Sequence, residues 1–207
     1  MNQSKTLKKF IYLISPNKIR DESFYTNLAL VLSSKKVSFF QLRLKNETTL
    51  NKLIVGKKIK KICKKYKVKF LINDDPVLAK KLNADGCHLG QKDMDLIKAR
   101  KILKNKIIGV TCHNSINLAK TAVNAGADYL AFGAFYASKT KIVKYRANLK
   151  IIKSVKKITM LPIVAIGGIK LNNYKKLLLN KANFLAISGY IWNNKKYKPF
   201  EAIKKLK

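Results

Sequence analysis

Carboxylates are scarce in this chain, and four of its ten acidic residues fall in two short segments. Asp74 and Asp75 follow one apolar run, and Asp93 and Asp95 follow the next. Asp75 precedes Pro76, which is typical of a helix cap, and Asp95 would lie in the first turn of a helix. A cap would also account for Asp93, whereas Asp74 has no such role left. Two carboxylates beside cationic side chains suit a Mg²⁺–phosphate site, because Mg²⁺ keeps few protein ligands and takes phosphate oxygens for the rest.

Cationic, hydroxyl and glycine residues follow other apolar runs and could bind phosphate. Arg43 and Lys45 follow one run, and the segment 138–141 follows another. Gly167-Gly168 and Ser188-Gly189 follow the last two runs, where their backbone N–H groups could bind a second phosphate. The segment 138–141 lacks the upstream glycines of a P-loop, so we do not expect it to bind a nucleoside triphosphate.

Candidate bases and nucleophiles are few. His88 lies inside an apolar run and is expected to be a packed core residue, whereas His113 follows a run and could either titrate or act as a neutral hydrogen-bonding group. Cys112 precedes His113, but neighbours in sequence do not have nucleophile–base geometry. With Cys63 and Cys87, the cysteines form no disulfide or zinc pattern, which indicates reduced thiols in a cytoplasmic protein.

The apolar runs are short, rich in β-branched and aromatic residues, and alternate with stretches of helical periodicity. Strands that alternate with helices imply right-handed crossovers and a parallel sheet. Eight such units in a chain of 207 residues predict an α/β fold, a single-domain (β/α)8 TIM barrel over residues 1–207. The rival is a doubly wound open sheet, but no G-x-G-x-x-G follows any run. The predicted strands are 10–14, 37–42, 68–72, 86–89, 107–110, 129–132, 163–166 and 184–187.

A weak internal repeat supports the barrel and divides it into two ends. Residues 83–90, 126–133 and 181–189 each contain a small residue, then Asp85, Asp128 or Asn183, then an apolar run and a glycine. The Asp or Asn can hydrogen-bond the backbone where the chain enters a strand, so we place these three at the amino end as stability residues. The polar residues that follow the strands would share the carboxyl rim, where barrel enzymes have their active sites.

The charge balance is strongly basic, with a formal net charge of +35 from 45 basic and 10 acidic residues. Only four of the basic residues are Arg, and the lysines are spread over the whole chain, which indicates compositional drift rather than a nucleic-acid site. No apolar run is long enough for a membrane span, and the run 10–14 is too short for a signal peptide. We therefore expect a cytoplasmic protein without a membrane or specific nucleic-acid partner. A homo-oligomer is compatible with the sequence.

Several segments together resemble one known family, thiamine-phosphate synthase. They occur in the family's order between about residues 10 and 192, and the set is more specific than any one motif. The segments are Gln-Leu-Arg-Leu-Lys at 41–45, Leu-Ile-Asn-Asp at 71–74, Ala-Asp-Gly-Cys-His-Leu-Gly-Gln-Lys-Asp at 84–93, Gly-Val-Thr-Cys-His at 109–113, 126–141, and Val-Ala-Ile-Gly-Gly-Ile at 164–169.

The resemblance implies a transferase that joins hydroxymethylpyrimidine diphosphate to hydroxyethylthiazole phosphate, or its carboxylated form, to give thiamine phosphate and diphosphate. By that likeness Asp74 and Asp93 bind Mg²⁺, and Arg43, Lys45 and Lys141 act as catalytic cations on the departing diphosphate. The pyrimidine diphosphate would be held by Gln41, Leu42, Arg43, Leu44, Lys45, Asn73, Thr111 and Lys141. The thiazole phosphate would be held by Ser138, Lys139, Thr140, Gly168, Ile187 and Ser188.

The chain departs from the family pattern at several positions. Leu44 stands where the family has an acid, and Ala134 and Ala137 stand where prolines are common. The segment 142–148 is short and basic, so the sequence does not establish whether it can close over the site as a lid.

Two alternatives remain at this point. A related subfamily, the thiazole tautomerases, shares the fold but tends to lose the second metal Asp and the Thr-Lys pair. Asp93, Thr140 and Lys141 are all present, which favours the synthase. A non-catalytic nucleic-acid-binding protein is the further alternative, and the net charge is its only support.

Overall fold

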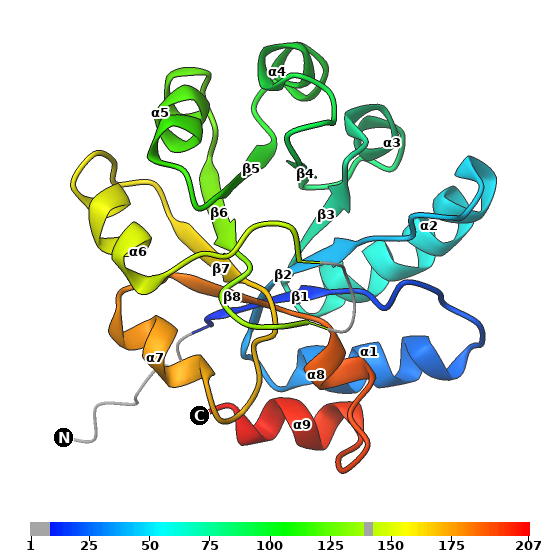
Figure 1. The fold of residues 1–207 in the computed structure, drawn as a ribbon. Helices are drawn as coiled ribbons and strands as arrows, with labels where there is room; N and C mark the ends of the chain where they lie inside the picture. The colour runs from blue at the N-terminus through cyan, green and yellow to red at the C-terminus, as the bar shows by residue number, and fades with distance from the viewer. Residues whose placement is uncertain (1–8, 139–142) are drawn as a thin grey trace, which may run out of the picture.

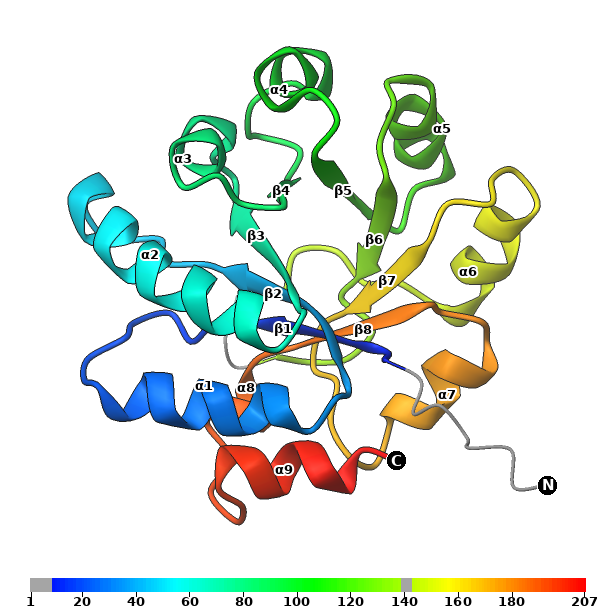
Figure 2. The same cartoon turned by 180° about the vertical axis from the view of Figure 1, so that it is seen from behind.

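The structure is a computed structural model that describes residues 9–138 and 143–207. Eight parallel strands close into a barrel in sequence order, and helices surround it (Figures 1 and 2). The (β/α)8 prediction is confirmed. The strands are β1 (Ile11–Ile14), β2 (Val37–Leu42), β3 (Lys69–Asn73), β4 (Gly86–Leu89), β5 (Ile107–His113), β6 (Tyr129–Gly133), β7 (Ile163–Ile166) and β8 (Phe184–Ile187).

The helices lie on the outside of the barrel, as both views show (Figures 1 and 2). They are α1 (Ser23–Ser33), α2 (Thr49–Lys65), α3 (Pro76–Lys81), α4 (Leu96–Leu103), α5 (Ile116–Asn124), α6 (Leu149–Lys156), α7 (Tyr174–Leu179), α8 (Gly189–Trp192) and α9 (Pro199–Lys205). In the described part of the chain no helix has the length and apolar content to cross a membrane.

Side-chain caps fix where several of these helices begin. Asp75 accepts a hydrogen bond from the N–H of Leu78 and is followed by proline, and Asp95 accepts from the first turn of α4. The cap predicted at Asp75 is therefore confirmed, whereas Asp95, predicted to lie in the first turn of a helix, is the cap residue just before α4. Because these two carboxylates are used locally, they are not available to the site.

β5 is longer than predicted and ends at His113 rather than at residue 110. Its pairing with β6 shifts register between Thr111 and His113, so a bulge carries the strand past the polar residues that were expected to form a loop. The extension places Thr111 in a strand of the barrel wall, which holds its side chain more rigidly than a loop would.

The molecule has two cores. The larger lies between the strands and the helices, and a smaller cluster fills the barrel interior around Tyr12, Leu71 and Tyr129. Gly109 on β5 makes room for this inner cluster, because a Cβ there would lie 1.8 Å from a ring carbon of Tyr129. Only glycine leaves space for a tyrosine at that position.

Asp85, Asp128 and Asn183 form three equivalent contacts at the amino end of the barrel, which we call the amino-end clips. Their side-chain oxygens accept hydrogen bonds at 2.7–2.9 Å from the backbone N–H groups of Phe70, Ile108 and Ile163, respectively. Each clip residue also donates its own N–H to the carbonyl of that same partner. The repeat therefore ties the starts of β4, β6 and β8 to β3, β5 and β7, which confirms the predicted place at the amino end and adds partners on the preceding strands.

A cation completes each amino-end clip. Lys69 lies 3.2 Å from Asp85, Arg100 lies 2.7 Å from Asp128, and the ammonium of Lys156 donates to Asn183 at 2.9 Å. Arg100 also donates to the carbonyl of Gly126, which fixes the loop before β6. These polar groups are satisfied within the fold, so they hold the barrel together without needing a ligand.

Candidate active site at the carboxyl rim

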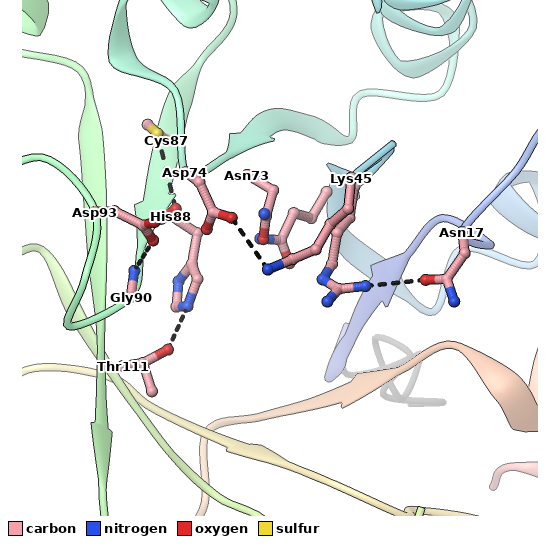
Figure 3. A network of polar contacts seen from close by, with 11 residues as sticks. Asn17, Lys45, Asn73, Asp74, Cys87, His88, Gly90, Asp93 and Thr111 are labelled. Atoms are coloured by element: carbon pink, nitrogen blue, oxygen red, sulfur yellow. Dashed lines mark hydrogen bonds and ion pairs between the residues drawn. The ribbon is translucent and has the colours of Figure 1, made fainter. Parts of the chain in front are cut away.

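Asp74 and Asp93 face each other at the carboxyl ends of β3 and β4 (Figure 3). Asp74 has a left-handed backbone with φ 64°, and its N–H donates to the carbonyl of His88 on β4 at 2.8 Å. Asp93 lies in the turn after β4, where its Oδ2 accepts a hydrogen bond from the N–H of Gly90 at 2.6 Å. Strained backbone of this kind is typical of functional sites. The backbone of Asp74 is therefore fixed to the neighbouring strand, and the carboxylate of Asp93 is held by the backbone of its own turn.

The pKa of Asp74 is raised from 3.8 to about 6. Burial is the largest cause, and the hydrogen bond and negative charge of Asp93 add to it, while Lys45 and Arg43 act in the opposite direction. Two carboxylates held this close repel each other unless a proton or a cation lies between them. The pair therefore fits a hard divalent cation such as Mg²⁺, which binds carboxylate oxygens. No cluster of three or more acidic, His or Cys ligands exists among the described residues, which suits a cation that takes its remaining ligands from phosphate and water.

Two cations, Arg43 and Lys45, follow the end of β2, and Lys45 reaches toward Asp74 (Figure 3). The ammonium of Lys45 lies 3.7 Å from Asp74 Oδ2 and is about half exposed. Arg43 donates to the side-chain oxygen of Asn17 at 2.9 Å, and burial lowers its pKa while Asp74 raises it. A half-exposed ion pair contributes little to stability, so Lys45 is available to an anionic ligand at the rim, while Asn17 orients the guanidinium of Arg43.

Amide groups line the same edge. Gln41 at the end of β2 is buried, and its side-chain N–H donates to Asn73 Oδ1 at 2.7 Å. Leu42 and Leu44, by contrast, pack in the large core. In the predicted binding segment 41–45, the polar side chains of Gln41, Arg43 and Lys45 are therefore the ones at the rim.

Thr111 and His88 lie next to the carboxylate pair. His88 is buried in β4, as predicted, and its Nε2 lies 2.8 Å from Thr111 Oγ1 (Figure 3). Gln91 donates to the backbone carbonyl of Thr111 from the β4 side. The hydroxyl and the backbone of Thr111 are thus both held.

The ends of β7 and β8 carry the residues predicted to hold the second phosphate. Gly168 has φ 60°, and a Cβ there would lie 2.2 Å from the carbonyl oxygen of Ala137. Ser188 donates to the carbonyl of Ser15, and Ile187 is buried beneath it. Ser138 ends the described part of the β6 loop, whereas Lys139, Thr140 and Lys141 lie outside the described residues.

His113 and Cys112 have contacts that do not form a catalytic pair. The ring of His113 stacks on Tyr145 with centroids 4.1 Å apart, beside a hollow of about 330 Å³. Cys112 is buried, and burial raises the pKa of its thiol to about 12. A thiol with that pKa is not a thiolate at neutral pH, so the geometry gives no support to covalent catalysis.

Sequence reasoning missed two residues that position Arg43. Ser15 accepts the backbone N–H of Arg43, and Asn17 accepts its guanidinium. Both follow the end of β1, in the same place relative to their strand as the predicted rim residues. The rule that found the other rim residues would have found these as well.

The comparisons with known proteins agree on one family. Residues 11–191 match the family described as thiamine monophosphate synthase. The thiamine-phosphate synthase of Pelagibacter ubique strain HTCC1062 is 85% identical over 207 residues, which is the full length of both chains. The thiamine-phosphate synthase of Marinobacter nauticus is 45% identical over 150 residues, covering 72% of this chain and 67% of that one.

The solved structures lead to the same group. A thiamine phosphate pyrophosphorylase from Pyrococcus furiosus superposes with a TM-score of 0.82 at 25% identity, over 97% of this chain and 95% of that one. A 3-hexulose-6-phosphate synthase superposes with a TM-score of 0.66 at 18% identity, a likeness that shows the barrel fold alone.

Proposed function

Because the chain belongs to the thiamine monophosphate synthase family, we propose that it joins hydroxymethylpyrimidine diphosphate to hydroxyethylthiazole phosphate, or its carboxylated form, to make thiamine phosphate and diphosphate, with CO2 also released from the carboxylated form. The observation that carries this proposal is the meeting of Asp74 and Asp93 with Arg43 and Lys45 at one rim. A diphosphate leaving group needs that combination, because its negative charge grows as the bond to carbon breaks.

Asp74 and Asp93 would hold Mg²⁺, which supplies positive charge to diphosphate oxygens when it is bound. The donor set fits this ion, since both groups are carboxylates and their closeness raises the pKa of Asp74. Thiolate ligands are not offered, because all three cysteines are buried and burial raises the pKa of each thiol far above neutral pH.

The residues of the chain neutralise the charge of the diphosphate and orient the two substrates. In the proposed reaction the carbon–oxygen bond to diphosphate breaks, both electrons leave with the oxygen, and the aminopyrimidine ring delocalises the positive charge left on carbon. The thiazole nitrogen then donates its electron pair to form the new carbon–nitrogen bond. Arg43 and Lys45 stabilise the departing diphosphate, together with the predicted Lys141. This reaction requires no strong base, which suits a rim where His88 and His113 are engaged in other contacts.

The partners that we propose are the two phosphorylated small molecules, with the cytoplasm as the place of action. Three free cysteines are in keeping with a reducing compartment. A homo-oligomer stays compatible with this proposal.

The test is a two-substrate assay with and without Mg²⁺. We expect thiamine phosphate only when both precursors and the ion are present. The matched pair of variants is Asp74→Asn, which removes a rim carboxylate, and Asp75→Asn, which keeps a cap because Asn and Asp cap helices equally well. Activity of Asp75→Asn with loss in Asp74→Asn supports the proposal. Conversion of a thiazole phosphate alone, without Mg²⁺, would instead indicate a tautomerase.

A further inference from the structure

A row of hydrogen-bonded groups crosses the barrel interior and ends at Thr111. The hydroxyls of Tyr12 and Tyr129 lie 2.8 Å apart, and the hydroxyl of Tyr129 lies 2.8 Å from His88 Nδ1. His88 Nε2 in turn lies 2.8 Å from Thr111 Oγ1 (Figure 3). The four residues come from β1, β6, β4 and β5, so the row links strands that are far apart in sequence.

This row is an unusual filling for a barrel. Barrel interiors are mostly filled by branched aliphatic side chains, and a buried hydroxyl is costly unless it is paired. Tyr12 and Tyr129 are 2% and 3% exposed, and burial raises the pKa of both phenols, so they stay protonated. Gly109 leaves the space that the Tyr129 ring occupies. The interior is thus built around the row.

The burial of Tyr12 sets the direction of the hydrogen bonds. Within the described residues, Tyr129 is the only hydrogen-bonding partner of the Tyr12 hydroxyl. If Tyr12 were the acceptor, its proton would be buried without a partner, which is the costly case. Tyr12 therefore donates to Tyr129, and the single proton of Tyr129 is donated to His88 Nδ1.

The same reasoning sets the direction of the hydrogen bond between His88 and Thr111. A neutral imidazole has one donor and one acceptor nitrogen, so accepting at Nδ1 places the proton on Nε2. Nε2 donates to Thr111 Oγ1, whose own proton is left to point away from His88. Thr111 is partly exposed at the rim, and Gln91 holds its backbone.

We propose that Tyr12, Tyr129 and His88 are positioning residues that make the Thr111 hydroxyl a hydrogen-bond donor to an acceptor atom of the bound pyrimidine diphosphate. This inference rests on the proposed function for the identity of the ligand. The orientation of the row does not rest on it, because the row is complete without a ligand. Within the described residues, the hydrogen bonds of these three residues reach the rim through Thr111.

The first test reads the proton on His88 directly. The chain has two histidines, so a long-range ¹H–¹⁵N spectrum of labelled protein contains two imidazoles, and His113→Asn assigns them. We expect neutral His88 with its proton on Nε2. In Tyr129→Phe the donor to Nδ1 is lost, and we expect the signal to move toward a mixture of tautomers. A proton on Nδ1, or on both nitrogens, in the unaltered protein would overturn the proposal.

The matched control for this spectrum is Tyr174→Phe. Tyr174 is also buried, and its hydroxyl bonds to the carbonyl of Lys207 in the outer core, outside the row. Removing that hydroxyl should lower stability without changing the His88 signal. A change of the His88 signal in Tyr174→Phe as large as that in Tyr129→Phe would overturn the proposal. Both spectra are recorded without substrate, so they decide the orientation even if the two-substrate assay fails.

The second test asks whether Tyr129 acts through Thr111. Thr111→Val keeps the shape of the side chain and removes the hydroxyl, and we expect it to raise KM for the pyrimidine diphosphate about three- to tenfold, the range for one neutral hydrogen bond. Tyr129→Phe should raise the same KM about threefold, with kcat and the thiazole KM little changed. In the Thr111→Val background, Tyr129→Phe should add almost nothing. Multiplying effects, or equal changes in both KM values, would contradict the proposal.

Discussion

The two ends of the barrel use the same side chains in opposite ways. At the amino end, each clip residue accepts a backbone N–H and lies beside its own cation, as Asp128 does with Ile108 and Arg100. At the carboxyl rim, Asp74 lies against a second carboxylate, and its pKa is raised to about 6. Carboxylates whose hydrogen bonds and charge are paired within the fold stabilise it. Carboxylates that repel each other are expected only where a bound ligand supplies the missing positive charge.

The cations show the same contrast. Lys69 and Arg100 lie within 3.2 Å of their acids at the amino end. Lys45 at the rim is 3.7 Å from Asp74 and half exposed. With 45 basic and 10 acidic residues the chain has no shortage of cations, so the loose pairing at the rim reflects geometry rather than supply. It leaves positive charge free for phosphate groups.

The largest effect should come from removing a rim carboxylate. Asp93→Ala should lower kcat/KM by about 100-fold or more, because a ligand of the predicted metal and part of the charge arrangement are lost. The free energy of unfolding should change little, because relief of the repulsion with Asp74 offsets the lost hydrogen bond from the N–H of Gly90. Steady-state kinetics and urea unfolding of the same sample measure both.

Asp85→Asn is the amino-end counterpart of that variant. It keeps the oxygen that accepts from Phe70 and loses only the charge toward Lys69, so activity should be unchanged. If Asp85→Asn reduced kcat/KM as much as Asp93→Ala, the division of labour between the two ends would be wrong.

The second effect is on stability and belongs to the amino end. Asp128→Ala removes the acceptor of the N–H of Ile108, a fully buried residue. We expect the free energy of unfolding to fall by about 2–3 kcal/mol. Asp128→Asn keeps the acceptor and should cost less than half as much. Mg²⁺ affinity should be the same in both variants. Urea denaturation followed by circular dichroism measures the difference, and equal losses in the two variants would contradict the role of the hydrogen bond.

Much of this contrast could be predicted from the sequence because both ends follow local rules. The strands were found from short β-branched runs, and the clips from the repeat around Asp85, Asp128 and Asn183. The helix starts at Asp75 and Asp95 left Asp74 without a capping role, and the family resemblance added Asp93 as its partner. A local sequence pattern is enough to predict such residues because each one contacts its own segment or the neighbouring strand.

The remaining features depend on contacts that no local pattern encodes. The bulge that carries β5 past Thr111 depends on its pairing with β6. His88 was expected to be a packed core residue, and it is buried. Its hydrogen bonds to Tyr129 and Thr111, however, depend on how β4, β5 and β6 are arranged in the barrel. Asn17 contacts Arg43 only because β1 and β2 are neighbours.

The third effect is a pH dependence that only the rim should show. The folded protein binds an extra proton on Asp74 between its ordinary pKa of 3.8 and about 6, so in the absence of metal this group makes the fold less stable as pH rises through that window. Mg²⁺ competes with that proton, and its apparent affinity should be about tenfold weaker at pH 5 than at pH 7. Calorimetric titration at the two pH values measures this. Asp74→Asn should lose the stability slope, and a slope that survives in that variant would assign it to another group.

The smallest effect should come from Asn183→Asp, which makes the third clip like the other two. Asn183 accepts from the N–H of Ile163 and from Lys156, whose pKa is lowered by partial burial. A carboxylate there would keep both contacts and add an ion pair, as at Asp85 and Asp128. We expect a gain of about 0.5 kcal/mol in unfolding free energy that shrinks at high salt, with unchanged kcat and KM. A loss of stability, or a gain that persists in Lys156→Met, would show that this clip works through the amide rather than through charge.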